Sequence, residues 1–159
     1  MPTILFVCTA NQFRSPIAAA CFSRKLVTTG QTGSWIVGSA GTWAVSGLHA
    51  HPKAIEAAAS LGLDLSKHIT REVDSMMLDS ADLVVVMERG HKEALEFEFP
   101  AVRTKIILLG RIVNNHYGEV PDPASDGFAH PKEAAALVCD CIEKGFSRLI
   151  ELATHSRDG

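Results

Sequence analysis

The sequence has no excess of positive charge and no long hydrophobic run. Its 159 residues contain 15 lysines and arginines against 18 aspartates and glutamates, a formal net charge of -3. Nucleic acids and anionic membrane surfaces attract clustered positive charge, so we expect neither as a partner. No apolar stretch approaches the ~20 residues of a membrane span, and the apolar run at 4–7 lacks the basic segment of a signal peptide. We therefore expect a cytoplasmic location. If the protein binds an anion, we expect a local group of donors and charges to do so, and not the net charge of the protein.

The cysteines and histidines show no metal-binding spacing. Cys139 and Cys141 are too close together for a Cys-x-x-Cys zinc knuckle, and none of the seven histidines falls in a His-Glu-x-x-His pattern. Cys8 and Cys21 complete the set of four cysteines. Two disulfides are one interpretation, but reduced thiols are the default for a chain without a signal peptide. We expect no metal, no cofactor, and core thiols at positions 21, 139 and 141.

What is present is the composition of a globular protein, with 47% apolar and 21% charged residues. The length predicts a single domain over residues 1–159. Four short apolar runs, at 4–7, 35–37, 83–87 and 106–109, are typical of strands covered on both faces. Helical spacing falls between them, at about 15–30, 52–62, 71–78 and 90–97, and again from 131 onward. This alternation predicts an α/β layer fold on a mostly parallel sheet, with the ligand site at the carboxyl ends of the strands.

A cysteine and an arginine frame the loop after the first predicted strand. Cys8 ends that strand, Arg14 follows six residues later, and Ser15-Pro16 is a typical helix start. The backbone N–H groups of such a loop, the helix N-terminus and the guanidinium can together bind a tetrahedral anion. The same field favours the thiolate of Cys8, to which Ser15 can donate a hydrogen bond. The pattern predicts a nucleophile inside an anion site, although a buried cysteine beside an exposed arginine has the same spacing.

A thiolate that attacks phosphorus also needs an acid. The acid protonates the alkoxide or phenoxide that leaves, and this typically contributes ~10²–10⁴-fold to the rate. Asp122 is a candidate because Pro121 and Pro123 stiffen the chain on both sides of it. Asp126, four residues later, is the rival carboxylate, and spacing does not choose between the two.

These motifs belong to a set of segments that extends over nearly the whole chain. The segments are 8–16 (CTANQFRSP), 39–42 (SAGT), 51–54 (HPKA), 61–68 (LGLDLSKH), 81–87 (ADLVVVM), 105–110 (KIILLG) and 120–123 (VPDP). With these segments in this order, the sequence resembles a low-molecular-weight protein tyrosine phosphatase of the bacterial type. The resemblance implies a three-layer α/β fold with a four-stranded parallel sheet flanked by helices, and two-step hydrolysis of phosphomonoesters without a metal.

The resemblance also implies catalytic roles. Cys8 attacks phosphorus to form a cysteinyl-phosphate, Asp122 protonates the leaving group and then activates water, and Arg14 binds the equatorial oxygens. The serine at position 15 stabilises the thiolate.

Further family positions shape and support the loop. The remaining residues of the phosphate-binding loop are Thr9, Ala10, Asn11, Gln12 and Phe13. In the family the asparagine takes a left-handed backbone conformation, which Asn tolerates better than most residues. A histidine and a serine support it, and here these would be His68 and Ser39.

One departure from the family concerns oxidation. Many members carry a second cysteine directly before the arginine, which protects the nucleophile by forming a disulfide with it. This position is Phe13 here, and Cys21 lies roughly 8–9 Å further along the predicted helix, too far to replace it. We expect oxidised Cys8 to lack a resolving partner.

Other departures lie on the rim of the pocket. Gln12 replaces an apolar residue or threonine, and Ala124 and Ser125 replace the aromatic pair that often follows Asp-Pro. The entrance is therefore wider or more polar. Trp43 either supplies one aromatic wall or packs on the surface. Phosphotyrosine, small aryl phosphates and phosphoarginine all stay open as substrates.

Two other classes of function compete with a phosphatase. An arsenate reductase on the same fold needs two relay cysteines, which the family places near residues 78–95, and that segment has none. A non-catalytic phosphate-binding module needs neither the thiol nor the acid. We expect a monomer that acts on a phosphorylated protein or a small aryl phosphate, and bacterial relatives often work beside a tyrosine kinase.

Overall fold

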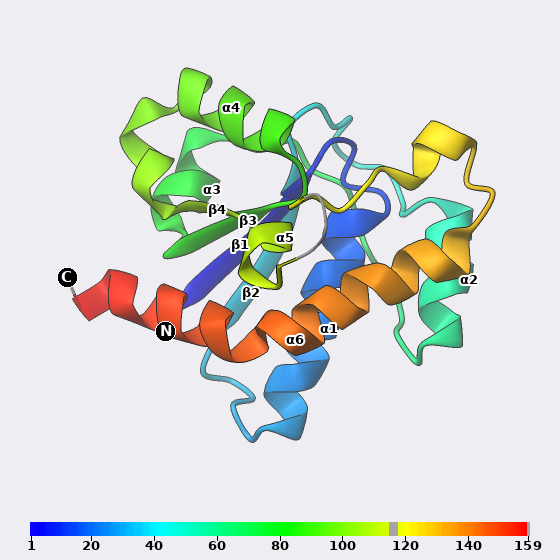
Figure 1. The fold of residues 1–159 in the computed structure, drawn as a ribbon, viewed down its shortest axis with the longest axis horizontal. Helices are drawn as coiled ribbons and strands as arrows, with labels where there is room; N and C mark the ends of the chain where they lie inside the picture. The colour runs from blue at the N-terminus through cyan, green and yellow to red at the C-terminus, as the bar shows by residue number, and fades with distance from the viewer. Residues whose placement is uncertain (115–117, 159) are drawn as a thin grey trace.

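The computed structural model describes residues 1–114 and 118–158. Within these ranges, four parallel strands form a central sheet. They are β1 (Thr3–Cys8), β2 (Ile36–Gly41), β3 (Leu83–Val86) and β4 (Ile106–Leu108), in the spatial order β2-β1-β3-β4. The register pairs Cys8 with Gly41 and Val7 with Val86. The carboxyl ends of β1, β2 and β3 therefore meet at one end of the sheet (Figure 1).

Helices connect and flank these strands. They are α1 (Arg14–Thr28), α2 (Pro52–Ser60), α3 (Ser75–Ser80), α4 (Arg89–Glu98), α5 (Leu109–Ile112) and α6 (Pro131–Asp158), with two 3₁₀ segments, η1 (Pro100–Lys105) and η2 (Pro123–Asp126). Over the described ranges, no helix combines the length and the apolar character that crossing a membrane requires.

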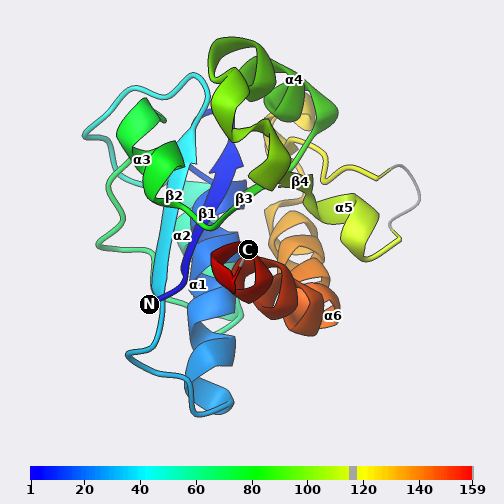
Figure 2. The same cartoon turned by 90° about the vertical axis from the view of Figure 1, so that its left-hand side faces the viewer.

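Alternate side chains of β1 enter two different cores. Ile4, Phe6 and Cys8 pack with residues of α1, α2 and α6, whereas Leu5 and Val7 pack with residues of α3, α4 and η1. This is the two-residue period expected of a strand that is covered on both faces. Figure 2 shows α1 and α6 on one side of the sheet and α3 and α4 on the other. The predicted three-layer α/β fold is confirmed.

Element boundaries differ from the predictions where local pairing outweighs the apolar pattern. β2 continues to Gly41 because it pairs with β1 along its whole length, although the apolar run ends at Val37. α3 begins later than expected because Asp74 Oδ1 accepts the N–H of Met77 at 2.8 Å and so caps the helix at that point. α5 and η2 have four residues each, too few for a periodic pattern to reveal them.

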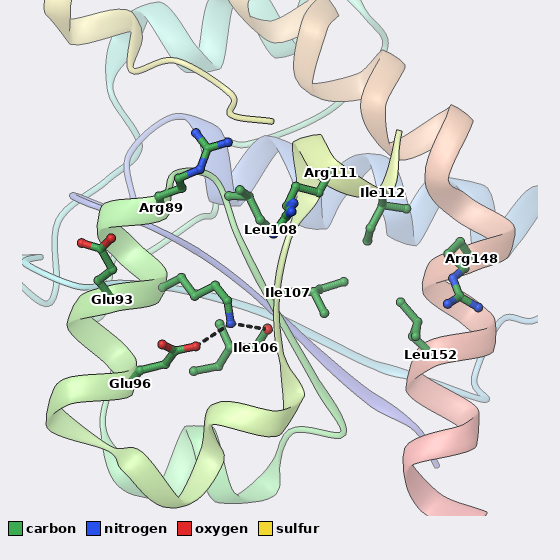
Figure 3. Close-up of a pocket in the computed structure, with 11 residues that line it drawn as sticks. Arg89, Glu93, Glu96, Ile106, Ile107, Leu108, Arg111, Ile112, Arg148 and Leu152 are labelled. Carbon is green, nitrogen blue, oxygen red and sulfur yellow. Dashed lines mark hydrogen bonds and ion pairs between the residues drawn. The ribbon is translucent and has the colours of Figure 1, made fainter. Parts of the chain in front are cut away.

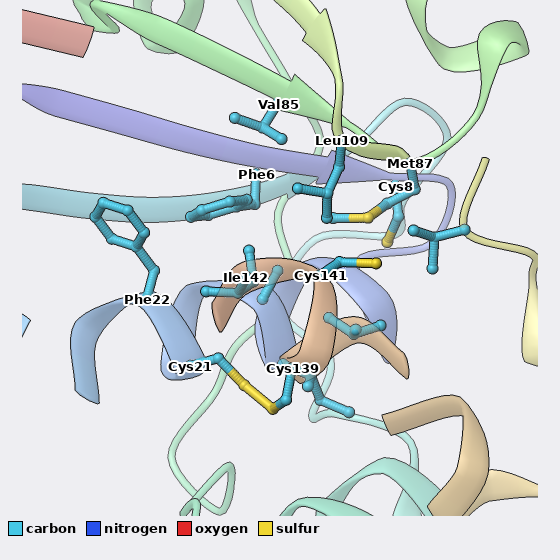
Figure 4. Close-up of a cluster of buried hydrophobic side chains, with 14 of the residues drawn as sticks. Phe6, Cys8, Cys21, Phe22, Val85, Met87, Leu109, Cys139, Cys141 and Ile142 are labelled. Carbon is cyan, nitrogen blue, oxygen red and sulfur yellow. A yellow bond between two sulfur atoms is a disulfide. The ribbon is translucent and has the colours of Figure 1, made fainter. Parts of the chain in front are cut away.

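The expectation that Cys21 and Cys139 are reduced core thiols is wrong. A disulfide joins them, with 5.7 Å between their Cα atoms, and links α1 to α6 (Figure 4). The two cysteines are 118 residues apart in sequence, so only the packing of α1 against α6 brings them together. Cys8 and Cys141 lie outside this bond, and both are buried in the same core.

Candidate active site

The loop between β1 and α1 turns sharply at Asn11. This residue has a φ of 59° and is fully buried. Asparagine is among the few residues that adopt this left-handed conformation readily. Ala10 is absent from the positive-φ residues and so fits the loop without that strain. The expected backbone shape of the loop is present.

The sulfur of Cys8 has a hydroxyl neighbour. Ser15 Oγ lies 3.0 Å from Cys8 Sγ, and both residues are buried. Asn11 Nδ2 donates to the same hydroxyl at 2.7 Å, which occupies it as an acceptor. The Ser15 proton is then available to the sulfur or to the carbonyl of Ala40, which is more distant at 3.4 Å. This arrangement suits a thiolate, because a charged acceptor forms the stronger hydrogen bond.

Asn11 is held by three partners outside the loop. Its Nδ2 donates to Ser39 Oγ at 3.0 Å, its Oδ1 accepts the N–H of Arg71 at 3.0 Å, and its carbonyl lies 2.7 Å from His68 Nε2. A carbonyl can only accept, so that ring nitrogen carries a proton. Burial lowers the pKa of His68, with a smaller contribution from the charge of Arg71, and the hydrogen bond to Asn11 only partly opposes this. His68 and Ser39 therefore both contact Asn11.

The guanidinium of Arg14 is buried and oriented from two sides. Its Nη1 donates to Glu88 Oε1 and to the carbonyl of Val120, each at 2.9 Å. Its Nη2 lies 3.7 Å from Asp122 Oδ2. Arg14 is only 3% exposed, whereas the Asp122 side chain is 41% exposed. The arginine is thus fixed, while the carboxyl beside it is open to solvent.

The structure separates the two rival carboxylates. Asp122 lies beside Arg14, and its Oδ1 accepts the N–H of Ala124 at 2.9 Å. Asp126 is exposed at the end of η2, where its Oδ1 accepts the N–H of Ala129 at 3.1 Å. Asp122 is therefore adjacent to the arginine that follows the loop between β1 and α1, and Asp126 makes a local turn contact.

A family model described as low molecular weight phosphotyrosine protein phosphatase matches residues 3–157. The chain belongs to this family.

Relatives of this phosphatase carry two different names. The protein-arginine-phosphatase of Bacillus subtilis (strain 168) is 35% identical over 120 residues, 76% of this chain and 78% of that protein. The low molecular weight protein-tyrosine-phosphatase Wzb of Escherichia coli (strain K12) is 33% identical over 141 residues, 89% and 88% of the two chains. The crystal structure of the low molecular weight protein tyrosine phosphatase from T. tengcongensis matches with a TM-score of 0.83 at 32% identity, covering 93% and 99% of the two chains.

Sequence reasoning missed two residues of this phosphatase, Glu88 and His91. Glu88 is the N-cap residue of α4 and His91 lies in the first turn of that helix, shortly after the end of β3. Glu88 contacts Arg14, and His91 Nε2 lies 2.8 Å from the hydroxyl of Thr9. The rule that ligand sites form at the carboxyl ends of parallel strands points to this segment. Polar residues directly after the apolar run at 83–87 were the available signal.

The rim of the pocket combines one exposed aromatic with small side chains. The Trp43 residue is 83% exposed, and its backbone N–H donates to the carbonyl of Thr9 at 3.0 Å, which places it next to the loop. Gln12 Nε2 donates to the carbonyl of His49 at 3.2 Å. Ala124 and Ser125 are exposed on η2, beside Asp122.

Phe13, in the position of the usual second cysteine, is buried. Its ring stacks on Phe128 with 5.9 Å between centroids, and Phe128 stacks in turn on His51 at 4.0 Å. The segment before α6 therefore packs against the bulky side chain at position 13 and stabilises it there.

A separate hollow lies away from the loop that follows β1. Its cavity volume is about 890 Å³, and it lies against β4 between α4 and α6. Figure 3 shows Arg89 and Glu93 on one side and Arg148 and Leu152 on the other. It contains none of the predicted site residues, so its size does not make it the reaction site. Within the described ranges, no cluster of three or more His, Cys, Asp or Glu side chains is arranged to hold a metal ion.

Proposed function

We propose that this phosphatase is a protein tyrosine phosphatase that acts through a cysteinyl-phosphate and without a metal ion. The observation that carries the proposal is the surroundings of Cys8. The hydroxyl of Ser15 lies 3.0 Å from the sulfur of Cys8. The loop that joins Cys8 to α1 ends at the buried Arg14, and Asp122 lies 3.7 Å from that arginine. This combination supplies a nucleophile, an anion site and an acid within one loop cluster.

In the first step the Cys8 thiolate attacks phosphorus, and the bond from phosphorus to the ester oxygen breaks. Asp122, in its acid form, gives its proton to that oxygen, so the alcohol or phenol leaves neutral. In the second step the Asp122 carboxylate takes a proton from water, the water oxygen attacks phosphorus, and the thiolate leaves. The products are inorganic phosphate and the original enzyme.

Arg14 and the loop N–H groups stabilise the charge on the transferring group. Because Glu88 and the carbonyl of Val120 both hold Nη1 of Arg14, the guanidinium does not need to be ordered during the reaction. Such preorganised donors act most strongly where charge develops in the transition state.

Phosphotyrosine is the proposed substrate group because Trp43 is exposed beside the loop, where an aromatic ring can stack against it. Phosphoarginine is the second candidate. The small Ala124 and Ser125 leave the other side of the entrance without an aromatic wall, and a relative is named as a protein-arginine-phosphatase.

The role of Asp122 is tested with three variants and 4-nitrophenyl phosphate. Cys8→Ser is expected to abolish turnover while inorganic phosphate still binds. Asp122→Asn is expected to lower kcat by about 10²–10⁴-fold for poor leaving groups and by less for 4-nitrophenol. Asp126→Asn is the matched control and is expected to retain full activity. Turnover by Cys8→Ser would refute the mechanism, and an equal loss in the two aspartate variants would move the acid role elsewhere.

The substrate group is tested by comparing peptides that carry phosphotyrosine, phosphoarginine or phosphoserine. We expect the highest kcat/KM for phosphotyrosine and a selective rise in KM for that peptide in Trp43→Ala. Faster turnover of phosphoarginine, with no effect of Trp43→Ala, would establish the second candidate.

The proposal extends to the setting of the enzyme. It acts as a monomer in the cytoplasm on phosphorylated proteins, beside a bacterial tyrosine kinase. The Cys21–Cys139 disulfide is compatible with a reducing compartment because both cysteines are buried, which limits attack by small thiols. Arsenate reduction is disfavoured, because Cys139 is already joined to Cys21 and the segment 78–95 has no cysteine.

A further inference from the structure

The N-terminal end of α4, with its N-cap residue Glu88, contacts both ends of the phosphate loop. At the end of the loop, Glu88 Oε1 accepts from Arg14 Nη1 at 2.9 Å, and at its beginning, His91 Nε2 lies 2.8 Å from Thr9 Oγ1. His91 is 4% exposed, and no step of the reaction described above uses it. A polar ring this deeply buried is held by specific hydrogen bonds.

The partners of His91 determine which ring nitrogen carries the proton. The backbone N–H of Glu88 lies 3.1 Å from Nδ1, and since an amide can only donate, Nδ1 accepts. The neutral ring therefore carries its proton on Nε2 and donates it to Thr9 Oγ1. Burial, and then the charge of Arg14, lowers the pKa of His91 to about 4, so this neutral form is present near pH 7.

Thr9 is thereby held at two points. Its hydroxyl accepts from His91, and its carbonyl accepts from the N–H of Trp43 at 3.0 Å. Thr9 directly follows Cys8, so its orientation sets the direction of the chain that leaves the nucleophile. On the far side of the loop, His68 holds the carbonyl of Asn11 in the same manner.

We propose that His91 is a positioning residue that fixes Thr9, and with it the first half of the phosphate loop, in the geometry that binds the transition state. The inference rests on the proposed function, because the loop geometry matters to rate only if the loop binds a transferring phosphoryl group. His91 contacts neither sulfur nor substrate in this role and acts through Thr9.

Two substitutions of His91 each keep one of its two hydrogen bonds and remove the other. The amide of His91→Gln reaches the position of Nε2 and can still donate to Thr9. The amide oxygen of His91→Asn reaches the position of Nδ1 and can still accept from Glu88, but the donor to Thr9 is lost. Thr9→Val removes the same bond from the other side while keeping the shape of the side chain. His155→Asn, at an exposed site on α6, is the control.

With 4-nitrophenyl phosphate, we expect His91→Asn and Thr9→Val each to lower kcat about tenfold with little change in KM. The double variant is expected to be no slower than the slower single variant, because both remove one hydrogen bond. His91→Gln is expected to stay within about threefold of wild type, and His155→Asn to be unchanged. If His91 only caps α4, His91→Asn will be active, Thr9→Val will have no effect, and the inference is overturned.

A measurement on the wild-type protein does not depend on activity. A long-range ¹H–¹⁵N NMR spectrum at neutral pH is expected to show the proton of His91 on Nε2. A proton on Nδ1 would overturn the inference and leave the phosphatase proposal standing. A wild-type protein that hydrolyses no phosphate ester would overturn the proposed function and the inference with it. In that case the Nε2 proton would still verify the contact between His91 and Thr9.

Discussion

The charges around His91 make this residue sensitive to acid. Arg14 disfavours its protonation, while the carboxylates of Asp122 and Glu119 favour it, and Glu88 Oε2 lies 3.9 Å from Nε2. Burial is the largest effect, and the result is a pKa of about 4 in the folded protein against an ordinary value of 6.5. The unfolded chain therefore takes up a proton on this ring at a higher pH than the folded protein does.

Stability is expected to fall as the pH is lowered from about 6.5 to about 4. In that window the unfolded state binds more protons, so the contribution of His91 is fully present above 6.5 and is lost by pH 4. The difference between the two pKa values corresponds to about 3 kcal/mol. Urea unfolding at about pH 7 and about pH 4.5 measures the loss, which should be smaller in His91→Gln. The same loss in both proteins would assign it to other groups, His68 among them.

Cys8 is the residue at which oxidation is expected to be irreversible. Phe13 occupies the position of a resolving cysteine, and Cys21 is already joined to Cys139. Peroxide should therefore convert Cys8 to sulfinic or sulfonic acid, with activity that dithiothreitol does not restore. In the variant Phe13→Cys, the new cysteine should form a disulfide with Cys8, and the activity of this variant should recover on reduction. Detection of a Cys8–Cys21 disulfide by mass spectrometry, with recovery of the wild type, would contradict the prediction.

At the scale of elements, the disulfide clamps α1 to α6. It closes a loop of 118 residues, for which loop entropy gives a stabilisation of about 4–5 kcal/mol. The N-terminus of α1 carries Arg14 and Ser15, but these are held by their own hydrogen bonds at the far end of the helix. The clamp therefore serves stability more than the geometry of the site.

Complete reduction with dithiothreitol, which the burial of both cysteines makes slow, is expected to lower the Tm by about 10 °C and to leave kcat at 25 °C unchanged. The variant Cys21→Ser/Cys139→Ser is the control, and its Tm should be low and insensitive to reductant. Differential scanning calorimetry gives the Tm, and hydrolysis of 4-nitrophenyl phosphate gives kcat. A loss of kcat on reduction that also appears in the double variant would show that the clamp shapes the site.

At the scale of the whole molecule, the site exists because three strands end side by side. The loop 9–13 follows β1, the segment 42–43 follows β2, and Glu88 comes shortly after β3. Gly41 lies under the loop, where an added Cβ atom would clash with the carbonyl oxygen of Thr9. Because that oxygen is backbone, the loop itself would have to move to make room.

Gly41→Ala is expected to lower kcat/KM for 4-nitrophenyl phosphate at least about tenfold through displacement of the phosphate loop. Gly90→Ala is the matched control, since a Cβ there meets no atom within 4 Å. Circular dichroism verifies that both variants fold. Full activity in Gly41→Ala would mean that the loop tolerates a shift of its backbone at Thr9.

Local chemistry in the sequence determined the strands, the main helices, and the position of a cysteine shortly before the start of a helix. Cys8, Arg14, Ser15 and Pro16 are close in the chain, so their spacing alone carries the signal. Apolar runs covered on both faces likewise predict a buried parallel sheet without knowledge of its neighbours.

Tertiary structure decided what depends on contacts between distant segments. Sequence spacing did not choose between Asp122 and Asp126, and the position of Arg14, more than 100 residues away, separates them. The same holds for the Cys21–Cys139 bond and for the contact of His91 with Thr9, 82 residues apart. Residue patterns record local periodicity, whereas these contacts depend on the order in which the strands join the sheet.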